Sequence, residues 1–343
     1  MPAGRTWPSF RCSGTTRAST TPGAPLEAAA QGLEIADDEW VLRCNLVTVI
    51  DGLMEDYSAG HISTEEAGAV IAELNRVIGG QNARFHRGVS YRHLVTLKGD
   101  LAVKTVPPHD ILGKPVAQHL PTGRGADRLR MLMERSQEIL KDHEVNVVRR
   151  DLGENPATGI WLWGEGKRPQ LPHFIERFGV KGAAVTAVDL VRGLAKLIGW
   201  DVIEVEGATG YVDTNYAGKG EASVKAMDKY DLVFVHVEAP DESGHNADVK
   251  AKVRSIEEID KHIVGPLLKR LKKEGDQWRI LVTPDHPTPC SARTHTAEPV
   301  PFAIAGLRME GVVEEPFTEE AAARSDLKIT RGCDLMEFFL TVR

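Results

Sequence analysis

Five side chains of metal-ligand type follow two short apolar segments in the last third of the chain. They are Asp241, His245, Asp285, His286 and His295. The apolar runs at 232–237 and 280–282 precede them and are typical of buried strands. Carboxylates and imidazoles that converge from loops at the carboxyl ends of strands can bind a divalent cation in an open α/β sheet. The spacing therefore predicts a metal centre, and the alternative is a polar loop with surface histidines.

The neighbours Asp285 and His286 add a second feature to this prediction. Adjacent side chains in extended backbone tend to point apart. The pair can therefore bridge two cations rather than serve one.

Length, charge and cysteine usage restrict the class of protein. A chain of 343 residues is long enough for two domains. Its net charge of −7 argues against a broad nucleic-acid surface, so no nucleic-acid partner is expected. No apolar run approaches the roughly 18 residues of a membrane span, and no signal-peptide core is present, so no membrane partner is expected. The four cysteines show no CxxC spacing, which fits a reduced cytoplasm and supports neither a zinc knuckle nor a disulfide framework.

Strand-like and helix-like segments alternate in the second half of the chain. Strands are expected at 183–185, 201–205, 232–237, 280–282 and 302–305, and helices at 189–198, 219–228, 249–273 and 331–343. Such alternation predicts an α/β fold with a mostly parallel sheet flanked by helices. Residues 160–343 are therefore expected to form the core that binds metal.

The first half follows a different pattern. Strands are expected at 43–50, 85–97 and 159–164, and helices from Thr64 and over 127–142. These elements predict a second, α+β domain over 25–159, which is expected mainly to cover the substrate. Residues 1–24 are rich in Ser, Thr, Arg, Pro and Gly without periodic apolar positions, which predicts a disordered segment.

Ten short motifs occur in one order from about Pro25 onward. They are PLEAAAQGLE, RCNLVTV, DYSAGHISTEEA, VSYRHL, PPHDI, GIWLWGEGK, ATGYVDTNY, APDESGHN, TPDHPTP and THTAEPVPF. Together they resemble the archaeal-type 2,3-bisphosphoglycerate-independent phosphoglycerate mutase family of the alkaline phosphatase superfamily. The resemblance implies interconversion of 2-phosphoglycerate and 3-phosphoglycerate through a phosphoserine, a step of glycolysis and gluconeogenesis.

The resemblance also implies an alkaline-phosphatase-like sheet and two divalent cations, usually manganese, cobalt or magnesium. By that resemblance, Asp241, His245 and His295 hold one metal, and Asp285 and His286 help to hold the other. A phosphate monoester repels nucleophiles because it is negatively charged. Two cations offset that charge and help to deprotonate a serine.

A mutase must also hold the glycerate while it reorients, which requires basic groups for its carboxylate and phosphate. The candidates for substrate binding are Arg43, Arg92 and Lys167, with His61 and Asp56 as polar groups that face hydroxyls. Each of them alone can equally be a surface or ion-paired residue. Lys219 is a weaker candidate, for which a structural role is favoured.

Two family segments are not found in this sequence. The family has a strand ending in Gly-Asp-Gly, whose Asp binds metal, and a later Gly-Ser-Asp that carries the nucleophile. Ser9, Ser13 and Ser19 lie in the anomalous first segment and not in that context. The catalytic nucleophile is therefore unassigned, and the chain as written is expected to be impaired.

A shift of reading frame explains the first segment. Codons for residues 11–24, RCSGTTRASTTPGA, permit LLGYDPREYYTGRA in another frame, and residues 3–10 permit GSDVAVVS. These alternatives resemble the family segments before PLEAA and around the nucleophile. We expect residues 1–24 to be out-of-frame translation; the alternative is a divergent tail on a truncated paralogue.

Two other functions remain open beside the mutase. One is a phosphatase or other phosphotransferase of the same superfamily. The other is a non-catalytic protein whose site has decayed. In the main interpretation the partner is a small-molecule phosphoglycerate, the location is the cytoplasm, and a homo-oligomer is compatible with the sequence.

Overall fold

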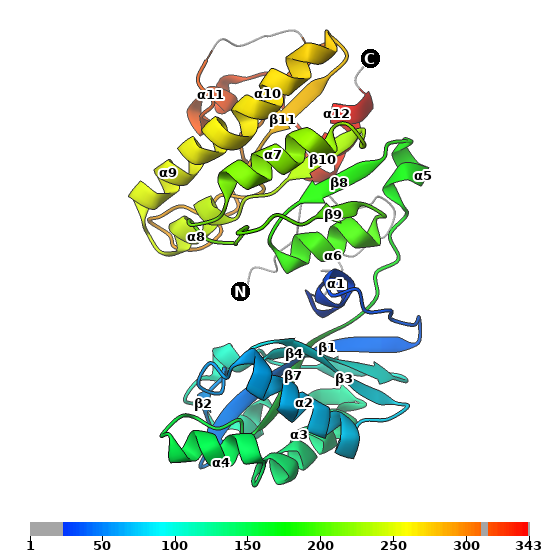
Figure 1. Cartoon of the computed structure of the whole chain (residues 1–343), viewed down its shortest axis with the longest axis vertical. Coiled ribbons are helices and arrows are strands. Elements are labelled where there is room, and N and C mark those ends of the chain that lie inside the picture. The colour runs from blue at the N-terminus through cyan, green and yellow to red at the C-terminus, as the bar shows by residue number, and fades with distance from the viewer. Residues whose placement is uncertain (1–22, 310–314, 342–343) are drawn as a thin grey trace. The chain divides into compact units, whose positions relative to one another are not determined.

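The computed structural model describes residues 23–309 and 315–341 of the 343-residue chain. The chain folds into two compact units, and the boundary between them lies between residues 170 and 171 (Figure 1). Each unit is described by itself. Thr21–Gln170 is called the N-terminal unit and Leu171–Arg343 the C-terminal unit. The anomalous segment 1–24 lies outside the described residues except for its last two. No helix in the described part of the chain has the length and apolar character to cross a bilayer.

An antiparallel five-stranded sheet forms the centre of the N-terminal unit. Its strands are β1 (Glu39–Ile50), β2 (Leu53–Asp56), β3 (Ala83–Val89), β4 (Arg92–Lys98) and β7 (Gly159–Lys167). The order β2-β1-β4-β3 is extended by β7, which pairs with β1. The long strand β1 therefore joins three neighbours and fixes the register of the sheet.

Helices cover one face of this sheet. They are α2 (Thr64–Ile78), α3 (Ala126–Leu140) and α4 (Glu144–Asp151) (Figure 1). Leu42, Cys44 and Leu46 point from β1 into this core and meet apolar side chains of α2 and α3. Helix α2 begins where the sequence predicts, because Ser63 and Glu66 form a reciprocal capping box.

The short helix α1 (Gly23–Ala30) packs on the opposite face. Alternate residues of a strand point to opposite faces, so Val41 turns away from Leu42 and contacts Ala24, Ala28 and Leu94. The unit also contains a hairpin of β5 (Ala102–Lys104) and β6 (Thr122–Arg124), and the 3₁₀ turns η2 (Pro108–Ile111) and η3 (Val116–His119).

Parallel pairing is found in the C-terminal unit, where it joins three of the described strands. They are β8 (Gly182–Val185), β9 (Asp201–Ile203) and β10 (Leu232–Val235), in the order β10-β8-β9. Helices α5 (Phe174–Phe178), α6 (Asp189–Leu197) and α7 (Tyr216–Ala226) accompany them. The crossovers through α6 and α7 produce the alternation seen in the sequence and confirm the α/β class.

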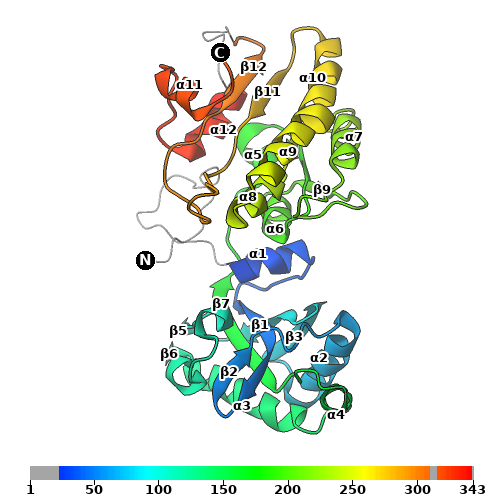
Figure 2. The ribbon, with the colours of Figure 1, turned by 90° about the vertical axis from the view of Figure 1, so that its left-hand side faces the viewer.

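The remaining strands, β11 (Arg279–Val282) and β12 (Ala303–Gly306), form an antiparallel pair (Figure 2). Among the described residues, β10 pairs only with β8 and β11 only with β12. Strand β10 is apolar and β11 is apolar after Arg279, and both are half-buried along their length. Each of these two strands therefore has one edge with no strand partner in the described part of the chain.

The other helices of this unit precede and follow that pair. They are α8 (Ala239–His245), α9 (Val249–Ile259), α10 (Gly265–Leu271), α11 (Glu319–Arg324) and α12 (Gly332–Thr341). The helix expected over 249–273 is interrupted by a π-helical turn, η4 (Asp260–Val264), and ends in the 3₁₀ turn η5 (Lys272–Glu274). Gly220 of α7 lies against this turn, since a Cβ there would approach the His262 carbonyl oxygen to 1.9 Å.

The division between units differs from the expected boundary after residue 159. Strand β7, Gly159–Lys167, pairs with β1 from Trp40 to Val47. It therefore belongs to the N-terminal sheet, and the connection to the C-terminal unit follows it. A single strand carries no local signal of which sheet it joins, because pairing is decided by distant residues.

Candidate metal centre

Helix α8 carries the first two candidate ligands. The chain leaves β10, passes His236 and enters α8 with Pro240 in the first turn, where a missing N–H costs little. Asp241 and His245 are four residues apart and therefore lie on one face of the helix. The His245 Nε2 is 3.3 Å from the Asp241 Oδ2.

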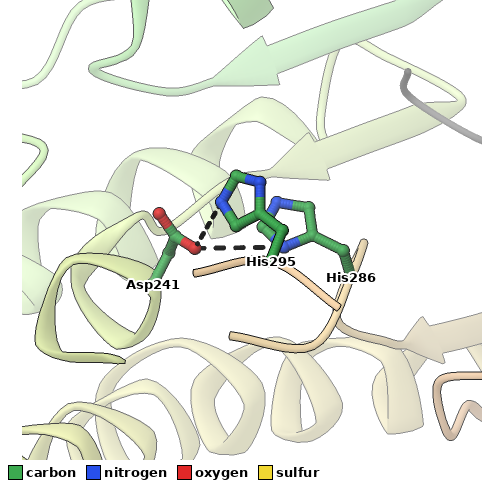
Figure 3. A group of neighbouring side chains, drawn as sticks. All are labelled: Asp241, His286 and His295. Carbon is green, nitrogen blue, oxygen red and sulfur yellow. Dashed lines mark hydrogen bonds and ion pairs between the residues drawn. The ribbon is translucent and has the colours of Figure 1, made fainter. Parts of the chain in front are cut away.

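The loop after β11 brings the other imidazoles to the same carboxylate (Figure 3). The His295 Nε2 lies 3.2 Å from the Asp241 Oδ1 and 3.1 Å from the His245 Nε2. The His286 Nδ1 is 3.9 Å from the same Asp241 oxygen. The rings of His286 and His295 lie face to face at a tilt, with centroids 3.9 Å apart. Three imidazoles thus surround one carboxylate.

Asp285 lies on the outer side of His286. Its Oδ2 is 3.5 Å from the His286 Nε2, and its Oδ1 accepts a hydrogen bond from the His286 N–H. His286 therefore has one ring nitrogen toward Asp241 and the other toward Asp285. The His286 ring therefore lies between the carboxylates of Asp241 and Asp285.

Thr288 orients the central carboxylate and was missed by sequence reasoning. Its Oγ1 donates a hydrogen bond of 2.5 Å to the Asp241 Oδ1, and its side chain is buried. The Lys252 ammonium holds the Thr288 carbonyl at 2.6 Å. Gly244 permits this contact, because a Cβ there would lie 2.3 Å from that carbonyl oxygen. Threonine is not a typical metal ligand, so no motif signals this role.

The donor set fits a divalent metal ion. Ligand atoms of Asp241, His286 and His295 all lie within 4.8 Å of one another. The His245 Nε2 is also 3.1 Å from the His295 Nε2 and 3.3 Å from the Asp241 Oδ2. Either His245 or His286 can therefore join Asp241 and His295 around one ion with bonds of about 2.0–2.2 Å. The His245 Nδ1 lies 3.1 Å from the Arg293 carbonyl oxygen, which can only accept a hydrogen bond, so the Nδ1 carries the proton. The Nε2 of His245 is then the free lone pair, and it faces the cluster. Glu238, Asp241 and Glu242 form an alternative acidic group on the same helix.

Two buried bases lie beside this cluster. Burial lowers the pKa of His236 to about 4, although the Asp285 charge opposes this shift. The His236 ring also lies 3.4 Å from a Glu238 carboxylate oxygen. Lys219 is 1% exposed, and its ammonium donates to the His236 carbonyl. Burial lowers the pKa of Lys219 to about 8 against the attraction of Glu238.

The depressed pKa of Lys219 predicts a pH-dependent stability. An unfolded lysine titrates near 10.4, so the unfolded state binds more protons than the folded state between about pH 8 and 10.4. The free energy of unfolding should therefore rise across this window through Lys219, by at most about 3 kcal/mol. Urea unfolding of the native chain and of Lys219→Met, both metal-free, measures the difference. Parallel curves from pH 7.5 to 10.5 would contradict the prediction.

The candidate substrate residues all belong to the N-terminal unit, and two of the basic ones have partners there. The Arg43 guanidinium binds the Glu27 carboxylate at 2.5–3.1 Å and lies over the Trp163 ring at 4.6 Å. The Lys167 ammonium donates to the Asp37 carbonyl and lies 5.5 Å from the Trp40 ring centroid.

The other three candidates, Asp56, His61 and Arg92, differ in the hydrogen bonds and ion pairs that their side chains form. Asp56 accepts four hydrogen bonds from its own turn and from Asn155. His61 and Arg92 are exposed. Neither the His61 ring nor the Arg92 guanidinium forms a hydrogen bond or ion pair with another residue in 23–309 or 315–341. These two are available to a ligand, whereas Asp56 is committed to the fold.

Comparisons with known proteins give a consistent result. The family described as "Metalloenzyme superfamily" matches residues 34–341. A 2,3-bisphosphoglycerate-independent phosphoglycerate mutase of Methanothrix thermoacetophila is 47% identical over 317 residues, which cover 92% of this chain and 80% of the relative. A protein of Geobacter sulfurreducens named as a probable enzyme of the same kind is 45% identical, with coverage of 94% and 82%.

Solved structures agree with the sequence relatives. The PH0037 protein of Pyrococcus horikoshii superposes with a TM-score of 0.74 at 27% identity, over 93% of this chain and 77% of that one. A cofactor-independent phosphoglycerate mutase of Thermoplasma acidophilum gives a TM-score of 0.64 at 26% identity, with coverage of 94% and 81%.

Proposed function

The chain belongs to the Metalloenzyme superfamily and, within it, to the 2,3-bisphosphoglycerate-independent phosphoglycerate mutases, and we propose that the cluster around Asp241 is the metal centre of that reaction. The reaction interconverts 2-phosphoglycerate and 3-phosphoglycerate. One observation carries the proposal: three imidazoles converge on a carboxylate that a buried threonine orients. Histidines that only stabilise the fold would not need three imidazoles around one carboxylate. They would also not need the lone pair of the His245 Nε2 to face the cluster.

Membership of the superfamily implies the use of divalent metal, and we propose two cations of manganese, cobalt or magnesium. Asp241, His245 and His295 would hold one, and Asp285 and His286 would help to hold the other. When bound, the cations supply positive charge that offsets the charge of the phosphate. The protein's own contribution is to fix the ligands: Thr288 sets the rotation of the carboxylate, and the Arg293 carbonyl sets the tautomer of His245.

Recognition of the glycerate is assigned to the N-terminal unit. Arg92 and His61 are exposed, and their charge and hydrogen-bonding capacity suit a carboxylate or phosphate oxygen. Arg43 and Lys167 can serve the same anion, but Arg43 must first release Glu27. For Asp56 we propose a role in the turn rather than contact with substrate hydroxyls, because its carboxylate accepts four hydrogen bonds within the fold.

The nucleophile is the part that this sequence does not assign. The expected Gly-Ser-Asp is not found in the printed residues, and Ser9, Ser13 and Ser19 lie outside the described ones. We propose that the 343-residue chain is impaired in forming the phosphoserine.

Turnover of 3-phosphoglycerate in the presence of manganese tests the function, with phosphorus NMR as the readout. The protein used has its reading frame corrected over residues 3–24 and extended upstream. A mutase should yield 2-phosphoglycerate without free phosphate. Release of inorganic phosphate as the main product would support the phosphatase alternative. Binding without any turnover would support the non-catalytic alternative.

A further inference from the structure

Three consecutive residues of the N-terminal unit adopt left-handed backbone. The φ angles are 48° at Ala59, 66° at Gly60 and 51° at His61. Glycine adopts this conformation freely, but a residue with a Cβ does so at a cost of about 1–2 kcal/mol. Ala59 and His61 therefore hold an unfavourable conformation that the surrounding structure must maintain.

The amide side of this turn is held by Asp56. One oxygen of its carboxylate accepts from the Ser58 N–H at 2.7 Å and the Ser58 hydroxyl at 2.6 Å. The other accepts from the Gly60 N–H at 2.6 Å and from the Asn155 side-chain amide at 3.2 Å. Partial burial acts to raise the pKa of the Asp56 carboxyl, but these hydrogen bonds together lower it.

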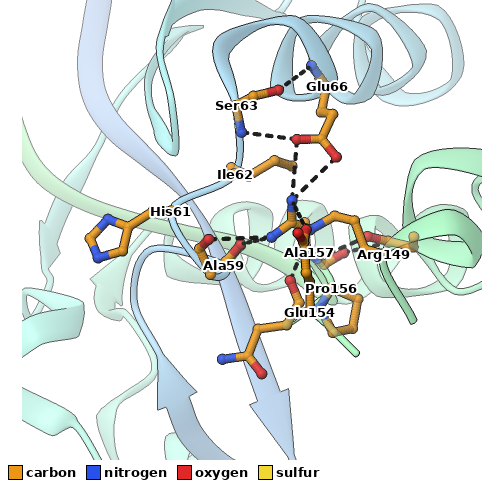
Figure 4. A network of polar contacts seen from close by, with 12 residues as sticks. Ala59, His61, Ile62, Ser63, Glu66, Arg149, Glu154, Pro156 and Ala157 are labelled. Carbon is orange, nitrogen blue, oxygen red and sulfur yellow. Dashed lines mark hydrogen bonds and ion pairs between the residues drawn. The ribbon is translucent and has the colours of Figure 1, made fainter. Parts of the chain in front are cut away.

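The carbonyl side is held by Arg149 (Figure 4). Its Nη2 donates to the Ala59 carbonyl at 3.0 Å and lies 3.3 Å from the Gly60 carbonyl. Its Nη1 pairs with Glu66 at 3.1 Å and with Glu154 at 2.9 Å. The side chain is 3% exposed. A buried guanidinium is costly to leave unpaired, so the two carboxylates keep it in place.

The side chain that this turn presents has no comparable role in the fold. The His61 ring is exposed, and among the described residues its one ring contact is an edge approach to Tyr91, with centroids 6.1 Å apart. A buried guanidinium and a half-buried carboxylate therefore maintain a strained turn whose tip carries an imidazole free to bind a ligand. The exposed His61 ring adds little packing that could offset the backbone strain of this turn. Backbone strain that is kept without such a benefit indicates a functional role.

We propose that Asp56 and Arg149 are positioning residues that hold His61 at a fixed place to bind an anionic oxygen of phosphoglycerate. This proposal rests on the proposed function for the identity of the ligand. The geometry of the clamp itself does not depend on that identity.

The test compares Arg149→Lys with Arg150→Lys in the full 343-residue chain. Lysine keeps the charge but cannot reach two carboxylates and two carbonyls at once. Arg150 is the next residue on the same helix and is exposed, so its variant is the matched control. NMR of the His61 ring, without ligand, should show that the contact with Tyr91 is lost in Arg149→Lys and kept in Arg150→Lys.

Calorimetric titration with 3-phosphoglycerate gives the second readout. His61→Ala and Arg149→Lys should each weaken binding about tenfold, the equivalent of one hydrogen bond to a charged group. Because Arg149 acts through His61, the double variant should be no weaker than His61→Ala alone. A purely structural role for Arg149 would instead multiply the two losses, and that result would overturn the proposal.

Two further outcomes are distinguishable. If the native chain binds no 3-phosphoglycerate, the proposal is wrong about the ligand. If the His61–Tyr91 contact is also kept in Arg149→Lys, the proposal is wrong about the positioning role of Arg149 as well. If Arg149→Lys does not fold, Gly60→Ala replaces it. Its Cβ would lie 2.7 Å from the Arg149 Nη2 and displace the guanidinium without removing a hydrogen-bonding group. An unchanged affinity in that variant would contradict the proposal.

Discussion

Correcting the reading frame of the first segment is expected to raise mutase activity by about 10⁴-fold or more over the 343-residue chain. The family reaction needs a serine to accept the phosphoryl group, and removal of a nucleophile typically costs rates of that order. The corrected protein reads GSDVAVVSLLGYDPREYYTGRA in place of residues 3–24 and continues upstream in the same frame. Both proteins are assayed with manganese and 3-phosphoglycerate, and formation of 2-phosphoglycerate is followed.

The control is the corrected protein with alanine at the serine of the restored Gly-Ser-Asp. Its rate should fall to nearly that of the 343-residue chain, because both then lack the serine that accepts the phosphoryl group. Equal rates for the 343-residue and corrected proteins would show that the nucleophile lies elsewhere in residues 25–343. The nucleotide sequence around the first thirty codons decides independently whether the frame is shifted.

Removal of the Asp241 carboxylate should strongly weaken the affinity for metal, which is the second largest effect that we expect. Four-ligand sites bind zinc with about 10–16 kcal/mol, or roughly 3 kcal/mol for each ligand. Asp241→Ala and His295→Ala should therefore each weaken binding of manganese at least about 100-fold, as measured by calorimetry on the 343-residue chain. Thr288→Val should weaken it about 10–100-fold, since it removes only the hydrogen bond that orients Asp241.

Two controls locate the ion. Asp276→Ala removes an exposed carboxylate of the same unit and should leave the affinity unchanged. Glu242→Ala removes a member of the alternative acidic group on α8 and should also have little effect. If Glu242→Ala weakened binding as much as His295→Ala, the ion would belong to the acidic face of α8 and not to the histidine cluster.

Local chemistry explains why much of the fold could be predicted. Helix α2 starts at Thr64 because Ser63 and Glu66 satisfy each other's backbone, and those residues are visible in the sequence. Strand β10 follows from an apolar run, and the carboxyl ends of the strands place the ligands after it. The extension of β1 back to Glu39 was not visible, because it depends on pairing with Lys98 of β4.

The candidate site residues also divide into those with a local sequence signal and those that depend on distant residues. Asp241 and His245 were expected in a loop, but they lie on α8, and their i, i+4 spacing was the signal of a helix. The hydrogen bonds of Asp56 to its own turn were not predicted, although DYSAG is a sequence in which a carboxylate can accept backbone N–H groups. Arg149 had no local signal of this role, since Ala59, Gly60 and Glu66 are distant in the sequence and meet it only in the folded unit.

The separation of the two sets of residues along the chain has an evolutionary consequence. Every candidate metal ligand lies between residues 238 and 295, in the C-terminal unit, and every candidate substrate residue lies between 43 and 167, in the N-terminal unit. A lineage could therefore exchange or remodel the N-terminal unit by recombination and acquire a new substrate, while it inherits the metal chemistry unchanged. Selection for specificity and selection for catalytic power would then act on different stretches of the gene.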